Sequence, residues 1–267
     1  MPNGFAQSDG EQIYFELWGT TGDVLVLGHG MGGSHAVWFQ QVAHFATDYR
    51  VITWDQRGFG RSTRSTGDIG PGPSVGDLLH LLDRLDIDRA HIVGQSMGGW
   101  SALGFAIDHP DRTLSLTLAD TTAGLFTPEI RAVLETIGRD IADGPTPGQL
   151  PLGRHPAIGD QLTEEDLAKS FLYSQMGSLT DPPSPMEIVP LLLATDHTDR
   201  AADLTAPTLF LVGENDPLFP PPLIERAAEL VPDSRRIVVP DTGHSPYFER
   251  PELWNDLVAR FLVRSQH

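Results

Sequence analysis

The segment around Ser96 constrains the fold of this chain more than any other. An apolar run at residues 90–93 leads into Gly94-Gln95-Ser96-Met97-Gly98, and a helix-like run follows from Trp100. Glycines on both sides of a serine permit a turn too tight for larger side chains and hold the serine in a strained backbone conformation. The hydroxyl is then raised above the end of the strand, beside the unpaired N–H groups of a helix N-terminus. This strand–turn–helix pattern is typical of a nucleophile elbow.

Strands and helices alternate on both sides of this turn. Short apolar and β-branched runs predict buried strands at residues 24–27, 51–54, 91–93, 114–118, 208–212 and 236–239. The side chains of residues 13–18 alternate in character along the chain, which predicts an edge strand. Helical patterns lie at 34–46, from Ser74 onward with Asp77 as a first-turn acid, at 97–108 and at 251–264. This alternation predicts an α/β fold with a doubly wound, mostly parallel sheet.

The alternation stops between residues 123 and 206. This segment contains nine prolines and helical stretches at about 128–143, 164–176 and 185–194. We expect a helical lid, residues 123–206, inserted between the first half of the core sheet, residues 1–122, and the second half, residues 207–267. A separate domain joined by linkers is the alternative, but the segment is too short and irregular to bury a core of its own.

Charge and cysteine content exclude several classes of function. The 267 residues include 36 acidic and 18 basic side chains, a net charge of -18, which disfavours nucleic acids and anionic membrane surfaces as partners. The chain has no cysteine, so disulfides, thiolate nucleophiles and cysteine-ligated metals are excluded. We expect a cytoplasmic protein, because neither a signal-peptide pattern nor an apolar run of about 20 residues is found. The sequence leaves homo-oligomerisation open.

A second glycine-rich segment, His29-Gly30-Met31-Gly32-Gly33, follows the strand predicted at residues 24–27. Open α/β sheets bind ligands at the carboxyl ends of their strands. With the Ser96 turn at the same edge, the backbone N–H groups of Met31 and Met97 are candidates for the two donors of an oxyanion hole. We interpret His29 as a buried histidine that holds the loop rather than as a proton carrier.

His244 and Asp216 are the candidates for a general base and its acid partner. His244 lies in a glycine-containing loop after the last predicted strand, and a loop of this kind can present an imidazole over a serine. Asp216 follows the strand predicted at 208–212, where a buried carboxylate can accept the Nδ1–H of the histidine. Asp120, also at the end of a strand, is the alternative acid.

The order Ser96, Asp216, His244 is that of the α/β-hydrolases, and the chain resembles this superfamily over essentially its whole length. Four motifs carry the resemblance: residues 29–32, 55–62, 94–98, and 213–216 together with 243–244. Residues 55–62 resemble a structural turn of the family, so we expect its acid and arginine to brace loops. The resemblance implies a serine hydrolase with a triad of Ser96, His244 and Asp216 that requires neither a metal nor an organic cofactor.

Within the superfamily, the short lid and the motifs resemble small esterases and enol-lactonases, which implies a small-molecule ester, lactone or related carbonyl substrate. Hydrolases that break C–C bonds of meta-cleavage products are a second interpretation, although they have a tryptophan just after the catalytic histidine, where this chain has Ser245. Perhydrolases share the same triad and are a third. Alternatives of other classes are a slow or non-catalytic ligand sensor and a cofactor-free dioxygenase with a His/Asp pair.

Overall fold

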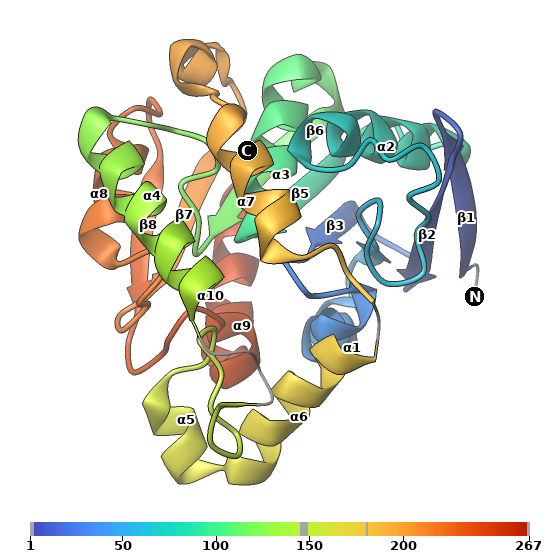
Figure 1. The fold of residues 1–267 in the computed structure, drawn as a ribbon. Helices are drawn as coiled ribbons and strands as arrows, with labels where there is room; N and C mark the ends of the chain where they lie inside the picture. Colours follow the sequence, from blue (N-terminus) through green and yellow to red (C-terminus); the bar gives the residue numbers. More distant parts are fainter. Residues whose placement is uncertain (1–2, 145–148, 180, 266–267) are drawn as a thin grey trace.

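The computed structural model describes residues 3–144, 149–179 and 181–265. Its eight strands form one sheet in the order β1-β2-β4-β3-β5-β6-β7-β8 (Figure 1). Strands β3 to β8 run parallel to one another, and β2 runs antiparallel to both of its neighbours. The strands are β1 (Asn3–Ser8), β2 (Glu11–Trp18), β3 (Val24–Gly28), β4 (Arg50–Trp54), β5 (Ala90–Gln95), β6 (Thr113–Ala119), β7 (Thr208–Gly213) and β8 (Arg235–Val239). The predicted α/β fold with a mostly parallel sheet is confirmed.

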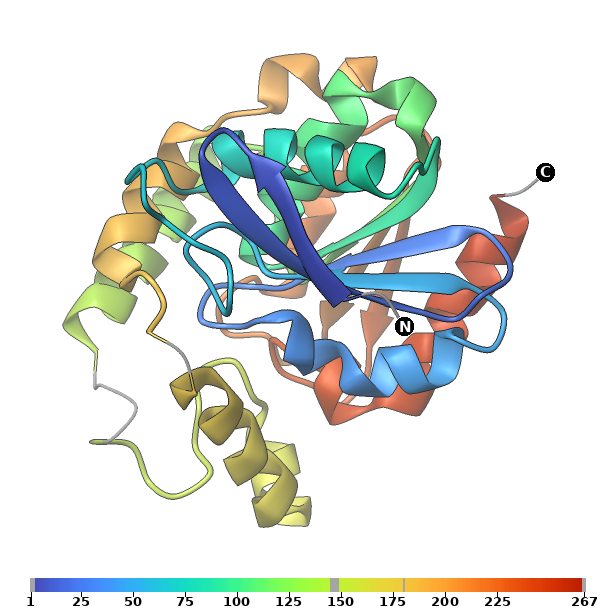
Figure 2. The ribbon, with the colours of Figure 1, turned by 90° about the vertical axis from the view of Figure 1, so that its right-hand side faces the viewer.

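Helices cover both faces of the sheet (Figure 2). Helices α2, α3 and α8 share one hydrophobic cluster with one face, and α1 and α10 share a second cluster with the other. Their bounds are α1 (Phe39–Phe45), α2 (Pro71–Arg84), α3 (Met97–Asp108), α8 (Pro221–Ala228) and α10 (Pro251–Arg264), with the short α9 (Pro246–Glu249) just before α10. Because the sheet is covered on both sides, β3, β5 and β7 are buried at every position.

The prediction of an edge strand at residues 13–18 is wrong. These residues belong to β2, but β1 pairs with β2 and occupies the edge of the sheet instead. Only Ala6 and Ser8 are buried in β1, so the strand has almost no apolar signal in its sequence. Its pairing is fixed by a tight turn, in which Asp9 and Gly10 both have positive φ angles.

Helix α2 begins at Pro71, one turn before the start predicted at Ser74. Gly70, with φ of 100°, turns the chain into the helix, and Pro71 suits the first helical position because its missing N–H would have no partner there. Asp77 is therefore not a first-turn acid. It is fully buried and accepts bonds from Arg57, at 2.7 Å from Nε and 2.5 Å from Nη2. This ion pair ties α2 to the turn that follows β4.

Between β6 and β7, the described residues form four α-helices: α4 (Pro128–Asp143), α5 (Asp160–Glu165), α6 (Leu167–Ser178) and α7 (Pro185–Ala194). They gather on one side of the molecule, at the left in Figure 2. Helices α4 and α7 contact each other, whereas α5 and α6 form a second pair at the bottom of Figure 1. The helix predicted at 164–176 is thus two helices divided at Asp166. The division into two core halves and a lid stays a prediction. Across the described ranges, no helix is both long and apolar enough to span a membrane.

Removal of the Asp77 carboxylate tests whether the buried ion pair holds α2 in place. Asp77→Ala leaves the Arg57 guanidinium buried without its main partner, so we expect the free energy of unfolding to fall by about 3–5 kcal/mol. The exposed pair of Asp83 and Arg112, 2.8 Å apart, is the matched control, since Asp83→Ala removes the same group from the same helix. That variant should lose less than about 1 kcal/mol. Urea unfolding followed by circular dichroism measures both, and equal losses would contradict the assignment.

Candidate active site

Ser96 lies between β5 and α3 in a strained backbone conformation. Its φ is 50° and its ψ is -121°, a region that costs free energy for a residue with a side chain. A Cβ added at Gly98 would lie 2.7 Å from the carbonyl oxygens of both Gly28 and His29, and one at Gly94 would clash with the Gly98 carbonyl. Close backbone contact therefore requires both glycines of the motif. The predicted strand, turn and helix are confirmed.

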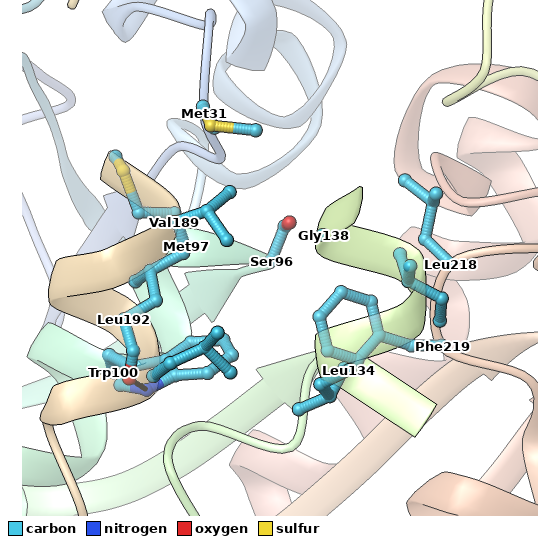
Figure 3. A pocket seen from close by; sticks show the side chains of 12 residues that line it. Met31, Ser96, Met97, Trp100, Leu134, Gly138, Val189, Leu192, Leu218 and Phe219 are labelled. Carbon is cyan, nitrogen blue, oxygen red and sulfur yellow. Dashed lines mark hydrogen bonds between the residues drawn. The ribbon is translucent and has the colours of Figure 1, made fainter. Parts of the chain in front are cut away.

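The Ser96 side chain opens into a small apolar cavity of about 70 Å³. Figure 3 shows its hydroxyl pointing into the space between α7 on one side and α4 and the loop after β7 on the other. The walls include Met31, Met97, Trp100, Leu134, Leu192 and Phe219. Within the described residues, no charged side chain lines this cavity. It therefore suits a neutral apolar group better than an ion, which would be buried without a partner.

His244 lies in the loop between β8 and α9, and its Nδ1 is 2.8 Å from Oδ2 of Asp216. Asp216 follows β7, and its Oδ1 accepts N–H bonds from Leu218 at 2.8 Å and Phe219 at 3.0 Å. The Phe219 ring stacks on the His244 ring with 5.5 Å between centroids. Gln95, next to Ser96, donates to the His244 carbonyl at 3.0 Å. The imidazole thus lies against a wall of the Ser96 cavity with its Nδ1 occupied.

The structure pairs His244 with Asp216 rather than with Asp120, the alternative acid. Asp120 follows β6 and is fully buried beside Asp216. Its Oδ1 accepts the Gly213 N–H at 2.9 Å, while its Oδ2 has no donor. Burial and the neighbouring Asp216 charge hold the pKa of Asp120 well above its ordinary value. Asp120 is therefore the protonated member of this pair of carboxyl groups.

Asp120, Asp216 and His244 also form a group that could hold a metal ion, since their ligand atoms all lie within 4.8 Å of one another. However, Nδ1 of His244 already pairs with Asp216. A proton on Asp120, whose pKa is raised, allows its carboxyl group to donate to the neighbouring Asp216. The donor set therefore fits a hydrogen-bonded chain from carboxyl to carboxylate to imidazole.

Met31 and Met97 come from two elements that meet at Ser96. Met97 is the first residue of α3, where a backbone N–H has no partner within the helix. Met31 lies in the loop after β3, and both methionines line the cavity. His29 anchors this loop: its Nδ1 donates to the next carbonyl at 2.7 Å, and its Nε2 accepts the Gln56 N–H at 3.1 Å. Burial lowers the pKa of His29, so it is a neutral anchor, as the sequence indicated.

The turn at residues 55–62 braces the same region, as its resemblance to a structural turn predicted. The Asp55 carboxylate accepts backbone N–H bonds from His35 at 2.5 Å and Arg61 at 2.8 Å. The His35 ring, from the short helix η1 (His35–Trp38), adds a further bond at 2.9 Å. Burial alone would raise the pKa of Asp55, but these bonds and the nearby histidines lower it.

Sequence reasoning missed two groups that contact the His244 loop. The Glu249 carboxylate, at the end of α9, accepts the N–H groups of Gly243 and Ser245. The Tyr173 hydroxyl, on α6, lies 2.9 Å from Oγ of Ser245. The only signal for Glu249 was an acid just before the start of the last helix. Tyr173 had no signal, because it is far from His244 in the sequence.

Comparison with known proteins assigns this geometry to a family. A family model described as alpha/beta hydrolase fold matches residues 23–251. The chain belongs to the α/β-hydrolase family. It is 29% identical over 266 residues to a protein of Azorhizobium caulinodans named "Putative carbamate hydrolase RutD", covering 96% of this chain and 97% of that protein.

Two solved structures extend the comparison. A thermophilic esterase from Thermogutta terrifontis is 28% identical, with a TM-score of 0.79 over 100% of this chain and 99% of the other. Est816, described as an N-acyl homoserine lactone degrading enzyme, is 25% identical, with a TM-score of 0.78 over 97% of this chain and 100% of the other. These names establish an enzyme of the hydrolase class for this α/β-hydrolase, and they differ in the group that is cleaved.

Asp120→Asn tests whether Asp120 carries a proton in the folded α/β-hydrolase. Because the pKa of Asp120 is raised on folding, its stabilising contribution is full below the unfolded pKa of about 3.9 and is lost as the pH rises toward the folded pKa. Asparagine stays neutral and still offers an oxygen to the Gly213 N–H. The Tm of the variant relative to the wild type should therefore increase from about pH 4.5 to about pH 7.5. Differential scanning calorimetry measures this difference, and a constant difference would show that Asp120 is ionised throughout.

Proposed function

We propose that this α/β-hydrolase is a serine hydrolase that cleaves a small neutral carboxylic ester or lactone through an acyl-enzyme on Ser96. One observation supports this most strongly: Ser96 opens into an apolar cavity whose wall residue Phe219 stacks on His244. His244 in turn lies 2.8 Å from Asp216 through Nδ1. Asp216 therefore fixes the tautomer in which the other ring nitrogen, Nε2, is the basic one.

In the first step, Nε2 of His244 takes the hydroxyl proton of Ser96 as Oγ forms a bond to the substrate carbonyl carbon. The carbonyl oxygen becomes negative, and the backbone N–H groups of Met31 and Met97 donate to it. His244 then gives the proton to the leaving alkoxide as the C–O bond breaks. In the second step, water loses a proton to His244 and adds to the acyl carbon. The acid leaves and Ser96 regains its proton.

The cavity walls favour a neutral acyl group. The described lining of the cavity is apolar on α4 and α7, and it carries no cation that could bind a carboxylate. Ester and lactone cleavage agree with the names of the esterase and of the lactone-degrading Est816, whereas the RutD relative is named for carbamates. A neutral carbamate also offers Ser96 a carbonyl carbon, so it is the second candidate substrate.

Hydrolysis of p-nitrophenyl esters from acetate to octanoate tests this function. We expect wild-type turnover of about 1 per second or faster, lower for the longer acyl chains because the cavity is about 70 Å³. Ser96→Ala should reduce kcat by about a thousandfold or more. Ser101→Ala is the matched control, because it removes a buried hydroxyl from α3, the helix that follows Ser96, where Ser101 donates to Gln56. That variant should keep most of its activity.

The other outcomes point to different reactions. Turnover that survives Ser96→Ala contradicts an acyl-enzyme and favours chemistry by the His244 and Asp216 pair alone. No turnover by the wild type contradicts ester cleavage. Assays with phenyl carbamates and with C–C substrates, followed by measurement of ligand binding, would then separate a carbamate hydrolase, a C–C hydrolase and a sensor.

A second experiment compares the two neighbouring acids. Asp216→Asn places an amide against Nδ1 of His244 and favours the wrong tautomer, so we expect kcat at neutral pH to fall by about a thousandfold or more. Asp120→Asn replaces a neutral carboxyl with a neutral amide and should keep most of the activity. Steady-state kinetics with p-nitrophenyl acetate measure both variants. The reverse ranking would assign the role of the acid to Asp120.

A further inference from the structure

The Glu249 carboxylate is buried against the backbone of the His244 loop, with 6% of the residue exposed. Its Oε1 and Oε2 lie 3.1 and 3.0 Å from the Gly243 N–H nitrogen, and Oε1 lies 3.2 Å from that of Ser245. These two residues flank His244. Because α9 is a single turn, the side chain of its last residue returns to the loop that precedes the helix. One carboxylate therefore fixes the backbone on both sides of the imidazole.

The same carboxylate reaches the segment between β6 and β7. Its Oε2 accepts the N–H of Gly159, just before α5, at 3.1 Å. On α6, Lys169 Nζ donates to the Glu249 carbonyl at 3.2 Å, and the Tyr173 hydroxyl lies 2.9 Å from Oγ of Ser245. Three polar contacts thus join the α5–α6 pair to the loop and helix that follow His244.

The pKa of Glu249 is raised by its burial, and N–H bonds from Gly243, Gly159 and Ser245, together with the charge of His244, offset only part of this effect. The electrostatic interaction between Glu249 and His244 is mutual. Burial and His244 lower the pKa of His155 to about 4, so His155 is neutral near pH 7. Several titratable and charged groups surround this region. They are Lys169 and Tyr173 on α6, His155 before α5, Glu165 on α5, Asp120 after β6, Asp216 after β7, Asp241 after β8, Tyr247 and Arg250 around α9, and Glu252 on α10.

We propose that Glu249 is a positioning residue for His244: its carboxylate holds the loop on both sides of the imidazole, and its negative charge favours the imidazolium that forms when Ser96 is deprotonated. Asp216 contacts the ring directly, whereas Glu249 acts through the flanking backbone and through space. This inference rests on the proposed function, because it requires His244 to be the base.

Glu249→Gln tests the charge. Glutamine keeps one acceptor oxygen, so its NH₂ group must face the N–H of Ser245 or Gly159. We expect kcat for p-nitrophenyl acetate to fall by about 10-fold to 100-fold with little change in KM, because the imidazole is misplaced. Without the negative charge the imidazolium is less stable, so the acidic limb of kcat/KM should move to lower pH by about half a unit.

Two further variants separate charge from shape. Glu249→Asp keeps the charge but is one methylene shorter, so turnover should fall while the acidic limb stays near its wild-type position. Glu252→Gln removes the same charge from an exposed position on α10 and should leave both kcat and the acidic limb unchanged. Thermal unfolding of each variant reports the loss of stability separately.

NMR titration of the His244 ring protons gives a readout that does not depend on turnover. The midpoint should lie at lower pH in Glu249→Gln than in the wild type or in Glu252→Gln. An unchanged midpoint and an unchanged acidic limb overturn the proposal, even if stability falls. If the midpoint of His244 shifts but the wild type does not hydrolyse esters, the proposed substrate is wrong while the effect of Glu249 on His244 stands. If Glu249→Gln does not fold, Glu249→Asp decides: a wild-type kcat overturns the proposal, and a lowered kcat with a wild-type KM supports it.

Discussion

The contact between the Ser96 turn and the end of β3 is the constraint on which the rest of the site depends. Gly98 lies so close to the carbonyl groups of Gly28 and His29 that no Cβ fits there. This contact places the Met31 loop and Ser96 at one cavity. The strain at Ser96 persists because β5 is buried at every position and α3 at nearly every one, so neither element can shift to relieve it.

Three buried carboxyl groups surround His244, and their environments give them different roles. Glu249 accepts N–H bonds from three residues. Asp216 accepts two backbone N–H bonds and a third bond from Nδ1 of His244. Asp120 accepts one N–H bond, on Oδ1, and its Oδ2 has no donor. Hydrogen bonds to the charged form favour ionisation, so the proton stays on the carboxyl group that receives the fewest of them. A chain with a net charge of -18 can therefore place three acids around one histidine without three buried charges.

The sequence predicts the turns and strands that neighbouring residues determine. It does not predict the pairings and contacts between residues that are far apart along the chain. The Ser96 turn, the loop after β3 and most parallel strands are encoded in short runs, so their positions could be predicted. Strand β1 was missed because its pairing with β2 depends on a tight turn rather than on apolar residues. Asp77 was misinterpreted as a first-turn acid because α2 begins one turn earlier, at Pro71, and its partner, Arg57, lies 20 residues away in the sequence. Glu249 had only a weak signal, since nothing in the sequence shows that its carboxylate is buried against three backbone N–H groups.

The segment between β6 and β7 contributes to the site in two separate ways. Helices α4 and α7 provide apolar walls of the cavity, through residues such as Leu134 and Leu192. The α5–α6 pair instead makes polar contacts with the His244 loop, through Gly159 and Tyr173. The shape of the cavity can therefore change through α4 and α7 without disturbing the contacts that hold the imidazole. This separation gives a physical reason why relatives that share the fold can be named for esters, lactones and carbamates.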